Sequence, residues 1–287
     1  MRYGLCLPNA GPWGDPRTLG ALAQVAEEAG WDGVFLEDYI VWQGHQGTPT
    51  YDPWVILAVM ALRTERIRLG TTVTPLPRRR PWKLASETVT LDHLSNGRLI
   101  LGAGLGDTES EDVSFSHFDE ELSLPERASM LDEALDVLTG LWSGEPFSYH
   151  GKHYRLNEVT LSPRPVQTPR IPIWVGGGWP LKGPTQRALR WDGSCMYKHT
   201  YGGPWEDWTP DDVRSLKTLS DNQRGVSGPF DIVVGGSRRD DDWERRRALI
   251  RSLAAAGATW WLEYIPPDTG GLDIVRDHIA GGPLRID

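Results

Sequence analysis

Three consecutive glycines, Gly176–Gly178, stand before a predicted helix and carry the clearest chemical signal of the sequence. Glycine lets a backbone approach a ligand closely, and the N–H groups of such a turn bind anions together with the positive end of the following helix. Thr185 is placed to cap that helix and to offer its hydroxyl to a phosphate. The pattern predicts a phosphate site, with Trp179 beside it, although an ordinary turn between strand and helix has the same outline.

Charged and aromatic residues gather after a later predicted strand. Lys198 and His199 end that strand, and Trp205 and Trp208 follow in the next segment. A cation and an imidazole there are suited to meet a substrate or a phosphate, and the tryptophans are suited to wall a pocket or close over it. A solvated surface segment is the alternative.

The last predicted strand carries a second candidate pair. Trp261 and Glu263 are two residues apart, so they share one face of the strand. If that face is the inner one, Glu263 is placed as a catalytic or substrate-binding carboxylate at the end of the strand. Arg78–Arg80 form a positive cluster at the start of a predicted helix, where an anion or surface acids would both be partners.

The sequence gives little indication of a metal site or of a catalytic nucleophile. His150 and His153 lie close together but have no third ligand nearby, so no metal site is expected. Cys6 and Cys195 fall on predicted inner strands, which favours packing over catalysis. The sequence also lacks a G-x-S-x-G nucleophile motif.

Composition excludes several classes of function. The 287 residues carry a formal net charge of −9, which argues against a general nucleic-acid binder. No segment approaches the apolar length of a membrane helix, and residues 1–8 are too short and too soon broken for a signal peptide. Two cysteines favour a reducing cytoplasm, and fourteen Trp against five Phe suggest an aromatic-walled pocket as well as core.

The chain alternates between short apolar runs and amphipathic segments. Eight such pairs predict an α/β protein with a single (β/α)8 TIM barrel over residues 1–287, and a doubly wound sheet is the alternative. Two inserted loops are expected, at 105–123 after the fourth strand and at 146–169 before the fifth. The expected strands are 2–7, 33–36, 67–73, 98–101, 171–175, 193–196, 231–234 and 258–264, and the expected helices are 19–29, 52–62, 81–94, 125–142, 185–190, 210–220, 241–256 and 272–279.

Three segments resemble the bacterial luciferase-like flavin-dependent monooxygenases. They are AGWDGVFLED at 29–38, LDHLSNGRLILGAG at 91–104 and LSPRPVQTPRIPIWVGG at 161–177, in collinear order. The resemblance covers residues 1–200 and thins beyond them. It implies a TIM barrel with a pocket at the C-terminal ends of the strands, and either reduced FMN or the deazaflavin F420 as cofactor.

The resemblance also implies roles for individual residues. Relatives hold a non-proline cis peptide against the flavin ring after the third strand, and the matching bond is Thr72–Val73. Arg127 stands where relatives have an arginine near the pocket. The cofactor-binding residues expected on this basis are Thr71, Thr72, Val73, Gly102, Ala103, Gly104, Trp174, Gly176, Gly177, Gly178, Trp179 and Thr185.

Two positions depart from the family pattern. Many relatives use a histidine as acid or base where this chain has Tyr39, and a phenol is a poor base at neutral pH. Tyr39 and Asp38 are nevertheless the expected catalytic pair, with Trp42 and His45 nearby to meet the substrate. F420-dependent sugar-phosphate dehydrogenases place an acidic residue where Leu105 stands, which counts against that activity.

Three functions follow from these features. The first is a monooxygenase that uses reduced FMN, supplied by a separate flavin reductase, and O2 on a small organic substrate. The second is an F420-dependent oxidoreductase that transfers hydride, for which the acidic tail of F420 favours a basic groove at Arg78–Arg80 and Lys198. The third is a non-catalytic flavin-binding barrel, which predicts that Tyr39, Thr72 and Glu263 are replaceable. Relatives often form homodimers through the helices after the second and third strands.

Overall fold

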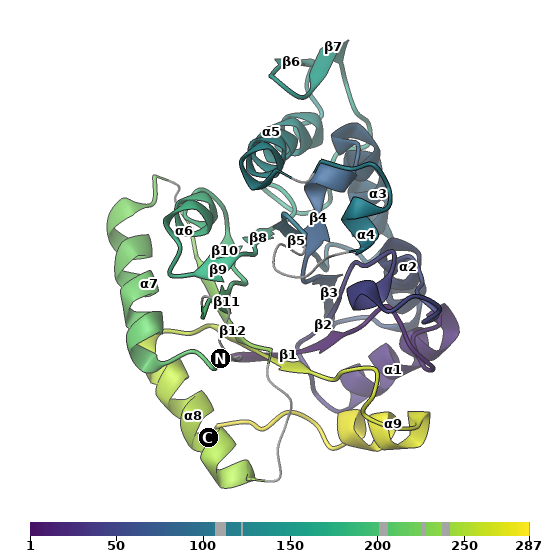
Figure 1. Cartoon of the computed structure of the whole chain (residues 1–287), viewed down its shortest axis with the longest axis vertical. Coiled ribbons are helices and arrows are strands. Elements are labelled where there is room, and N and C mark those ends of the chain that lie inside the picture. The colour runs from purple at the N-terminus through teal and green to yellow at the C-terminus, as the bar shows by residue number, and fades with distance from the viewer. Residues whose placement is uncertain (107–112, 122, 201–205, 226–227, 237–241, 287) are drawn as a thin grey trace.

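Eight parallel strands close into a barrel in the computed structural model, which describes residues 1–106, 113–121, 123–200, 206–225, 228–236 and 242–286. Around the barrel each strand pairs with the next, and pairing between β3 and β5 and between β1 and β13 completes the ring. The predicted TIM barrel is therefore confirmed, and the helices surround it (Figure 1). The barrel strands are β1 (Arg2–Leu7), β2 (Gly33–Leu36), β3 (Arg68–Thr71), β5 (Leu99–Gly104), β8 (Ile173–Val175), β10 (Gly193–Ser194), β12 (Asp231–Gly235) and β13 (Trp260–Tyr264).

The helices follow the strands as the sequence pattern predicts. Asp52 caps its helix with a side chain that accepts from the backbone N–H groups of Trp54 and Val55, and Asp15 caps the first helix in the same way. The helices are α1 (Pro16–Glu28), α2 (Pro53–Arg63), α3 (Pro81–Leu94), α4 (Val113–Ser116), α5 (Leu124–Trp142), α6 (Lys182–Ala188), α7 (Pro210–Gln223), α8 (Trp243–Ala256) and α9 (Leu272–Ala280), with short 3-10 turns η1 (Trp42–Gly44) and η2 (Leu76–Arg78).

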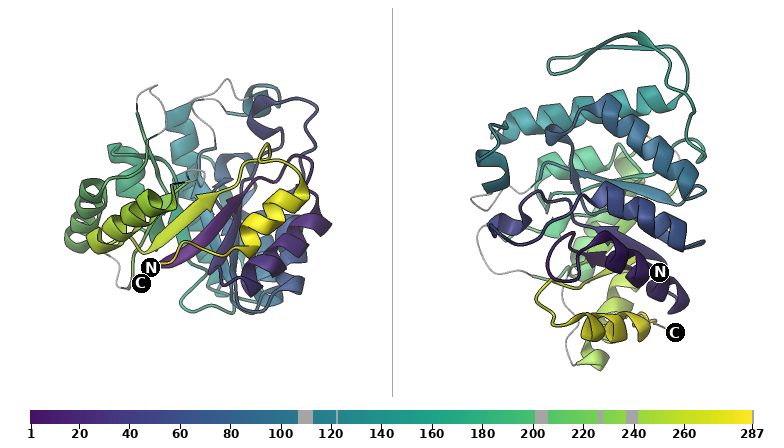
Figure 2. Two further views of the ribbon diagram at one scale, coloured as in Figure 1. Left: turned by 90° about the horizontal axis from the view of Figure 1, so that it is seen from below. Right: turned by 90° about the vertical axis from the view of Figure 1, so that its right-hand side faces the viewer.

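The insertions differ in part from expectation. The segment 146–169 contains the predicted hairpin, β6 (Phe147–His150) and β7 (Arg155–Val159), which projects beyond α5 (Figures 1 and 2). The segment 105–123 is not a continuous loop, because α4 lies within it. The third strand stops at Thr71 rather than Val73, and the short β4 (Thr74–Pro75) resumes after a break. Two further short strands, β9 (Gly178–Trp179) and β11 (Tyr197–Lys198), pair with each other beyond β8 and β10.

The core has two layers. Inside the barrel lie Phe35, Ile100, Trp174, Val233, Trp260 and Leu262, and the larger layer fills the space between the sheet and the helices. Side chains on a strand alternate between these layers, so an inner residue identifies the inner face of its whole strand. The tryptophan surplus goes mainly into these two layers, since ten of the fourteen tryptophans are buried. No described helix is both long and apolar enough to cross a membrane.

Candidate functional site

The carboxyl ends of three adjacent strands bring polar side chains together inside the barrel mouth. Phe35 points inward on β2, so Glu37, two residues further along, points the same way. Leu262 sets the inner face of β13 and hence the direction of Tyr264. Cys6 lies on β1 between these strands, paired in register with Phe35 on one side and Tyr264 on the other. One side of the mouth is therefore polar.

Glu37 is the main ionisable group on this side. It keeps part of its surface open to solvent, and its Oε2 accepts a hydrogen bond of 2.9 Å from Trp42 Nε1. Burial raises the pKa of Glu37 to about 7, although the Trp42 and Tyr264 side chains lower it in part. A carboxyl with this pKa exchanges a proton readily at neutral pH.

The neighbours of Glu37 stay uncharged. Burial, with Glu37 as the next largest cause, raises the pKa of Cys6 to about 12 and also raises the pKa of Tyr264. The Cys6 thiol lies 3.1 Å from the Thr72 hydroxyl. The Tyr264 Oη is buried and has no hydrogen-bond partner among the described residues. Because the Tyr264 side chain also lowers the pKa of Glu37, its hydroxyl lies near that carboxyl and is placed to donate to it or to a ligand oxygen or nitrogen between them.

The part of the mouth next to this polar side, at the ends of β3, β5 and β8, is apolar and built around Val73. The peptide bond between Thr72 and Val73 is cis, as the family resemblance implies. A Cβ on Gly104 would lie 2.4 Å from Val73 Cγ2, and one on Gly176 would lie 2.8 Å from Val73 Cγ1. Both glycines are needed because Val73 rests directly on their backbones.

These two sides fit a flat redox ring. Val73, supported by Gly104 and Gly176, supplies a small apolar surface, and Glu37 with the Tyr264 hydroxyl supplies hydrogen-bonding groups in the neighbouring part of the mouth. A flavin or deazaflavin has an apolar ring face and a polar edge, so the donor and acceptor set matches its chemistry.

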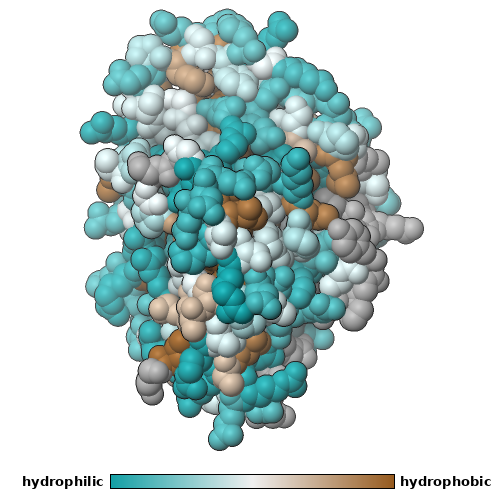
Figure 3. Space-filling model, turned by 90° about the vertical axis from the view of Figure 1, so that its left-hand side faces the viewer, coloured by the Kyte–Doolittle hydropathy of each residue, from teal (hydrophilic) through white to brown (hydrophobic). Residues whose placement is uncertain are grey.

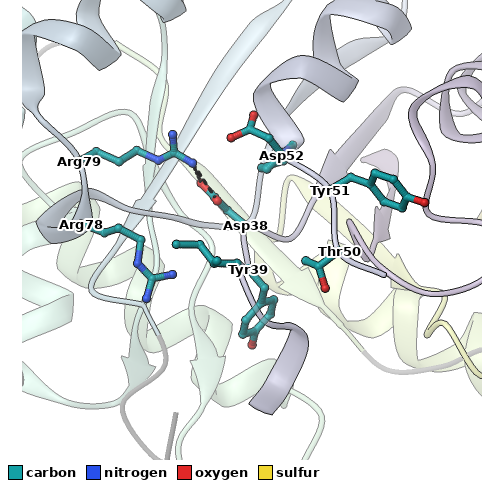
Figure 4. Close-up of a pocket in the computed structure, with 9 residues that line it drawn as sticks. Asp38, Tyr39, Thr50, Tyr51, Asp52, Arg78 and Arg79 are labelled. Carbon is teal, nitrogen blue, oxygen red and sulfur yellow. Dashed lines mark hydrogen bonds and ion pairs between the residues drawn. The ribbon is translucent and has the colours of Figure 1, made fainter. Parts of the chain in front are cut away.

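Asp38 and Tyr39 line a cavity that Glu37 does not line. Both Asp38 carboxylate oxygens accept from Arg79 Nη2, at 2.9 and 2.8 Å, and the Tyr39 side chain points away from this pair (Figure 4). Burial raises the pKa of Asp38, although Arg79 lowers it in part. The two residues line a cavity of about 320 Å³ together with Thr50, Tyr51, Asp52, Arg78 and others. Asp38 is thus occupied in an ion pair.

Trp42 lies against Glu37, and His45 packs on Trp42; that they face the substrate stays a prediction. Their rings stack with centroids 5.3 Å apart on and beside η1, and Trp42 donates to Glu37. The structure therefore places Trp42 at the mouth, in contact with Glu37, and His45 next to Trp42. Sequence reasoning left Glu37 and Tyr264 out of the site, although the alternation along β2 and β13 was the signal that finds them.

The predicted pair on the last strand shares one face, and that face is the outer one. Glu263 is buried against Nε2 of His278 on α9, and the guanidinium of Arg246 on α8 lies 5.8 Å from the Trp261 ring centroid. Both side chains therefore pack between β13 and the helices. Trp260 points into the barrel, and side chains alternate along a strand, so Trp261 and Glu263 point outward. This alternation is the reason why they do not lie on the inner face that the sequence analysis considered.

Several expected cofactor residues are structural. Trp174 is fully buried inside the barrel and donates to Asp231 over 3.2 Å. The Thr71 hydroxyl donates to the Gly102 carbonyl, and a Cβ on Gly102 would lie only 1.9 Å from Thr71 O. Ala103 is fully buried in the outer layer. These residues close the barrel below and beside the mouth.

The glycine run fits a close turn in the chain itself. A Cβ on Gly177, whose φ is +151°, would lie 2.5 Å from Pro184, and one on Gly178 would lie 2.9 Å from His199 Cβ. Thr185 does not cap a helix, because α6 begins at Lys182, and the Thr185 hydroxyl donates to the Leu181 carbonyl. Contacts within the chain thus account for three of these residues.

Trp179 and the basic candidates are held by neighbours. Trp179 stacks on the buried Trp208 and donates to Asp212 over 3.0 Å. Lys198 Nζ lies 3.1 Å from Asp212 and 3.5 Å from Glu206. Burial lowers the pKa of Lys198, but these carboxylates outweigh it and raise the pKa above its usual value.

The arginines are held in the same way. Arg127 is buried and donates to the Leu105 carbonyl. The guanidinium carbons of Arg127 and Arg78 each lie 3.9 Å from the centroid of the Phe115 ring. Arg78 also forms an ion pair of 2.9 Å with Glu120. Trp205 lies outside the described residues. The described residues contain no group of three or more His, Cys, Asp or Glu placed to hold a metal ion.

Comparison with known proteins places this barrel among redox enzymes. The family model described as luciferase-like monooxygenase matches residues 1–182. An F420-dependent glucose-6-phosphate dehydrogenase of Microbacterium testaceum is 36% identical over 168 residues, which cover 58% of this chain and 48% of that protein. An F420-dependent hydroxymycolic acid dehydrogenase of Mycobacterium tuberculosis is 35% identical over 164 residues, 56% of this chain and 44% of that protein. The chain spans about half the length of the curated relatives it matches.

Solved structures match nearly the whole chain. An F420-dependent secondary alcohol dehydrogenase in complex with an F420-acetone adduct has a TM-score of 0.76 at 19% identity and covers 99% of both chains. The monooxygenase RslO1 from Streptomyces bottropensis has a TM-score of 0.74 at 20% identity, over 97% of this chain and 96% of that one. At such identities the likeness shows the fold, which both kinds of enzyme share.

Proposed function

Because the chain belongs to the luciferase-like monooxygenase family, we propose that it is an oxidoreductase that transfers hydride between coenzyme F420 and a small organic substrate. The curated relatives at 34–36% identity are F420-dependent dehydrogenases. The monooxygenase structures share the fold at 16–20% identity. The relatives therefore favour F420 over the combination of reduced FMN and O2 that was the first interpretation of the sequence.

One observation carries the proposal: the barrel mouth has an apolar side at Val73 and a proton-exchanging side at Glu37. When bound, F420 supplies the hydride acceptor or donor. The chain's own residues bind a ring face through Val73, Gly104 and Gly176, and hold polar groups beside it. Hydride transfer involving an alcohol or a carbonyl also moves a proton, and the polar side of the mouth holds a group suited to that step.

An uncharged substrate fits this mouth better than a sugar phosphate. Leu105, which stands where the resemblance associates an acidic residue with sugar-phosphate dehydrogenases, packs partly buried against the core. Lys198, Arg78 and Arg79 are each paired with a carboxylate, so they offer little free positive charge to a phosphate. We therefore propose a small alcohol or ketone as the substrate class.

A homodimer through α2 and α3 remains part of the proposal. Apolar residues on these helices are exposed: Val55 and Leu62 on α2 are 60% and 72% exposed, and Trp82 and Leu94 on α3 are 40% and 39% exposed. Val55 and Leu62 are seven residues apart and so share one helix face. The side of the molecule that carries α7 and α8 is instead largely hydrophilic, with small separate apolar spots (Figure 3).

A binding titration tests the choice of cofactor. The purified protein is titrated with F420, FMN and reduced FMN, the last without O2, and binding is followed by tryptophan fluorescence and by absorbance. We expect F420 to bind at least tenfold more tightly than either form of FMN. Preference for reduced FMN, followed by O2 uptake, would instead support the monooxygenase. If none of the three binds below about millimolar concentration, an affinity of only ~4 kcal/mol, the proposal fails.

A further inference from the structure

Glu37 differs from the other carboxylates near the mouth because it has no cation partner among the described residues. Its neighbour in sequence, Asp38, is held by Arg79 at 2.8 Å. The hydrogen bond to Glu37 Oε2 comes instead from the neutral indole N–H of Trp42. A carboxyl held by a neutral donor keeps its orientation in both protonation states, whereas a carboxylate paired with arginine loses that pairing when it is protonated.

The two titratable groups that flank Glu37, Cys6 and Tyr264, stay neutral. Cys6 on β1 and Tyr264 on β13 flank it, and Tyr39 and Asp268 act in turn on Tyr264. Burial raises the pKa values of Cys6 and Tyr264 well above the neutral range. Glu37 is therefore the group in this cluster that changes charge near neutral pH.

Glu37 also remains reachable. It retains partial exposure at the inner face of the mouth, and the Tyr264 Oη beside it is buried and has no hydrogen-bond partner among the described residues. Tyr39, where many relatives are expected to carry the acid or base, points away from the Asp38–Arg79 pair (Figure 4), and a phenol is a poor base at neutral pH.

We propose that Glu37, and not Tyr39, is the catalytic acid and base, and that the Tyr264 hydroxyl donates to the substrate oxygen. This inference rests on the proposed F420-dependent function. In alcohol oxidation the substrate C–H bond breaks and its electron pair leaves as hydride to oxidised F420. The O–H proton passes to the Glu37 carboxylate, and the C=O bond forms. In the reverse direction protonated Glu37 returns the proton to the carbonyl oxygen.

The test compares wild type with E37Q and with E263Q, a matched change at a buried glutamate on the outer face of β13. Infrared spectroscopy of the cofactor-free protein follows the band of protonated carboxyl groups against pH. We expect a band in wild type and E263Q that disappears with a midpoint near pH 7, and its loss in E37Q. A neutral-midpoint band that persists in E37Q, or its absence from wild type, would overturn the proposal.

Binding and turnover separate this inference from the proposed function. F420 affinity is measured for all three proteins, and hydride transfer from propan-2-ol to F420 is followed in a single turnover. We expect E263Q to match wild type in F420 affinity and rate, and E37Q to bind F420 but to transfer hydride more slowly by about 10²–10⁴. Equal rates in E37Q and wild type refute the role of Glu37. Failure of wild type to bind F420 refutes the proposed function, and the infrared result then decides only whether Glu37 titrates as described.

Discussion

Replacing Glu37 by glutamine is expected to change how stability depends on pH. The folded state raises the pKa of Glu37 from 4.5 to about 7, because burial disfavours the charged carboxylate. The protonated form is thus favoured by folding, so its contribution to stability is complete below pH 4.5 and is lost as pH rises through about 7. At roughly 1.4 kcal/mol for each pH unit, the loss amounts to about 3 kcal/mol.

Glutamine resembles the protonated carboxyl in size and cannot ionise, so E37Q lacks this loss. Urea unfolding at several pH values between 4.5 and 8 measures the free energy of unfolding of both proteins. We expect the free energy of unfolding of E37Q, relative to that of wild type, to rise by about 3 kcal/mol from pH 4.5 to pH 8. Y264F is the companion variant: the Tyr264 side chain lowers the pKa of Glu37, so its removal shifts the stability loss to higher pH. Parallel curves for wild type and E37Q would refute the reasoning.

The remaining predictions concern the rim, the platform and the proposed dimer. D38N leaves the partly buried Arg79 without its carboxylate and is expected to cost about 3 kcal/mol in urea unfolding; R79M in the same chain should recover part of it. G176A places a Cβ 2.8 Å from Val73 and is expected to cost about 1–3 kcal/mol and weaken F420 binding, with V73A as the rescuing second change; an unchanged melting temperature and affinity would contradict the platform. L62E puts a charge on the exposed face of α2 and should convert the proposed dimer to monomer in light scattering; an unchanged mass would exclude that face.

The barrel could be predicted because its signals are local. Each buried parallel strand is a short apolar run, and helix starts such as Asp52-Pro53 carry their capping chemistry in adjacent residues. The third helix follows its pattern over 81–94 without error. The differences are shifted ends, as at α6, where Leu181 rather than a residue with a capping side chain precedes the helix, and short elements that the pattern did not predict, such as α4, β4, β9 and β11.

The site was harder to predict from the sequence, because the direction of a side chain depends on how its strand is placed in the whole barrel. Trp261 and Glu263 have the spacing of a pocket pair, and only the position of Trp260 inside the barrel shows that they point outward. Likewise, Lys198 is a free cation in the sequence and an ion-pair partner of Asp212 in the fold. Those contacts join residues far apart in the chain, which spacing alone does not reveal.

The polar side of the mouth is built from two distant parts of the sequence, which bears on how the proposed substrate preference would change. β1 and β2 come from the start of the chain and β13 from near its end, yet the three are neighbours in the barrel. The family match ends at residue 182, whereas Tyr264 lies well beyond it. Val73, Gly104 and Gly176, by contrast, lie wholly inside the matched region. Exchange of the later segment between relatives would thus alter what lies beside Glu37 while the Val73 platform, the proposed cofactor surface, stays intact.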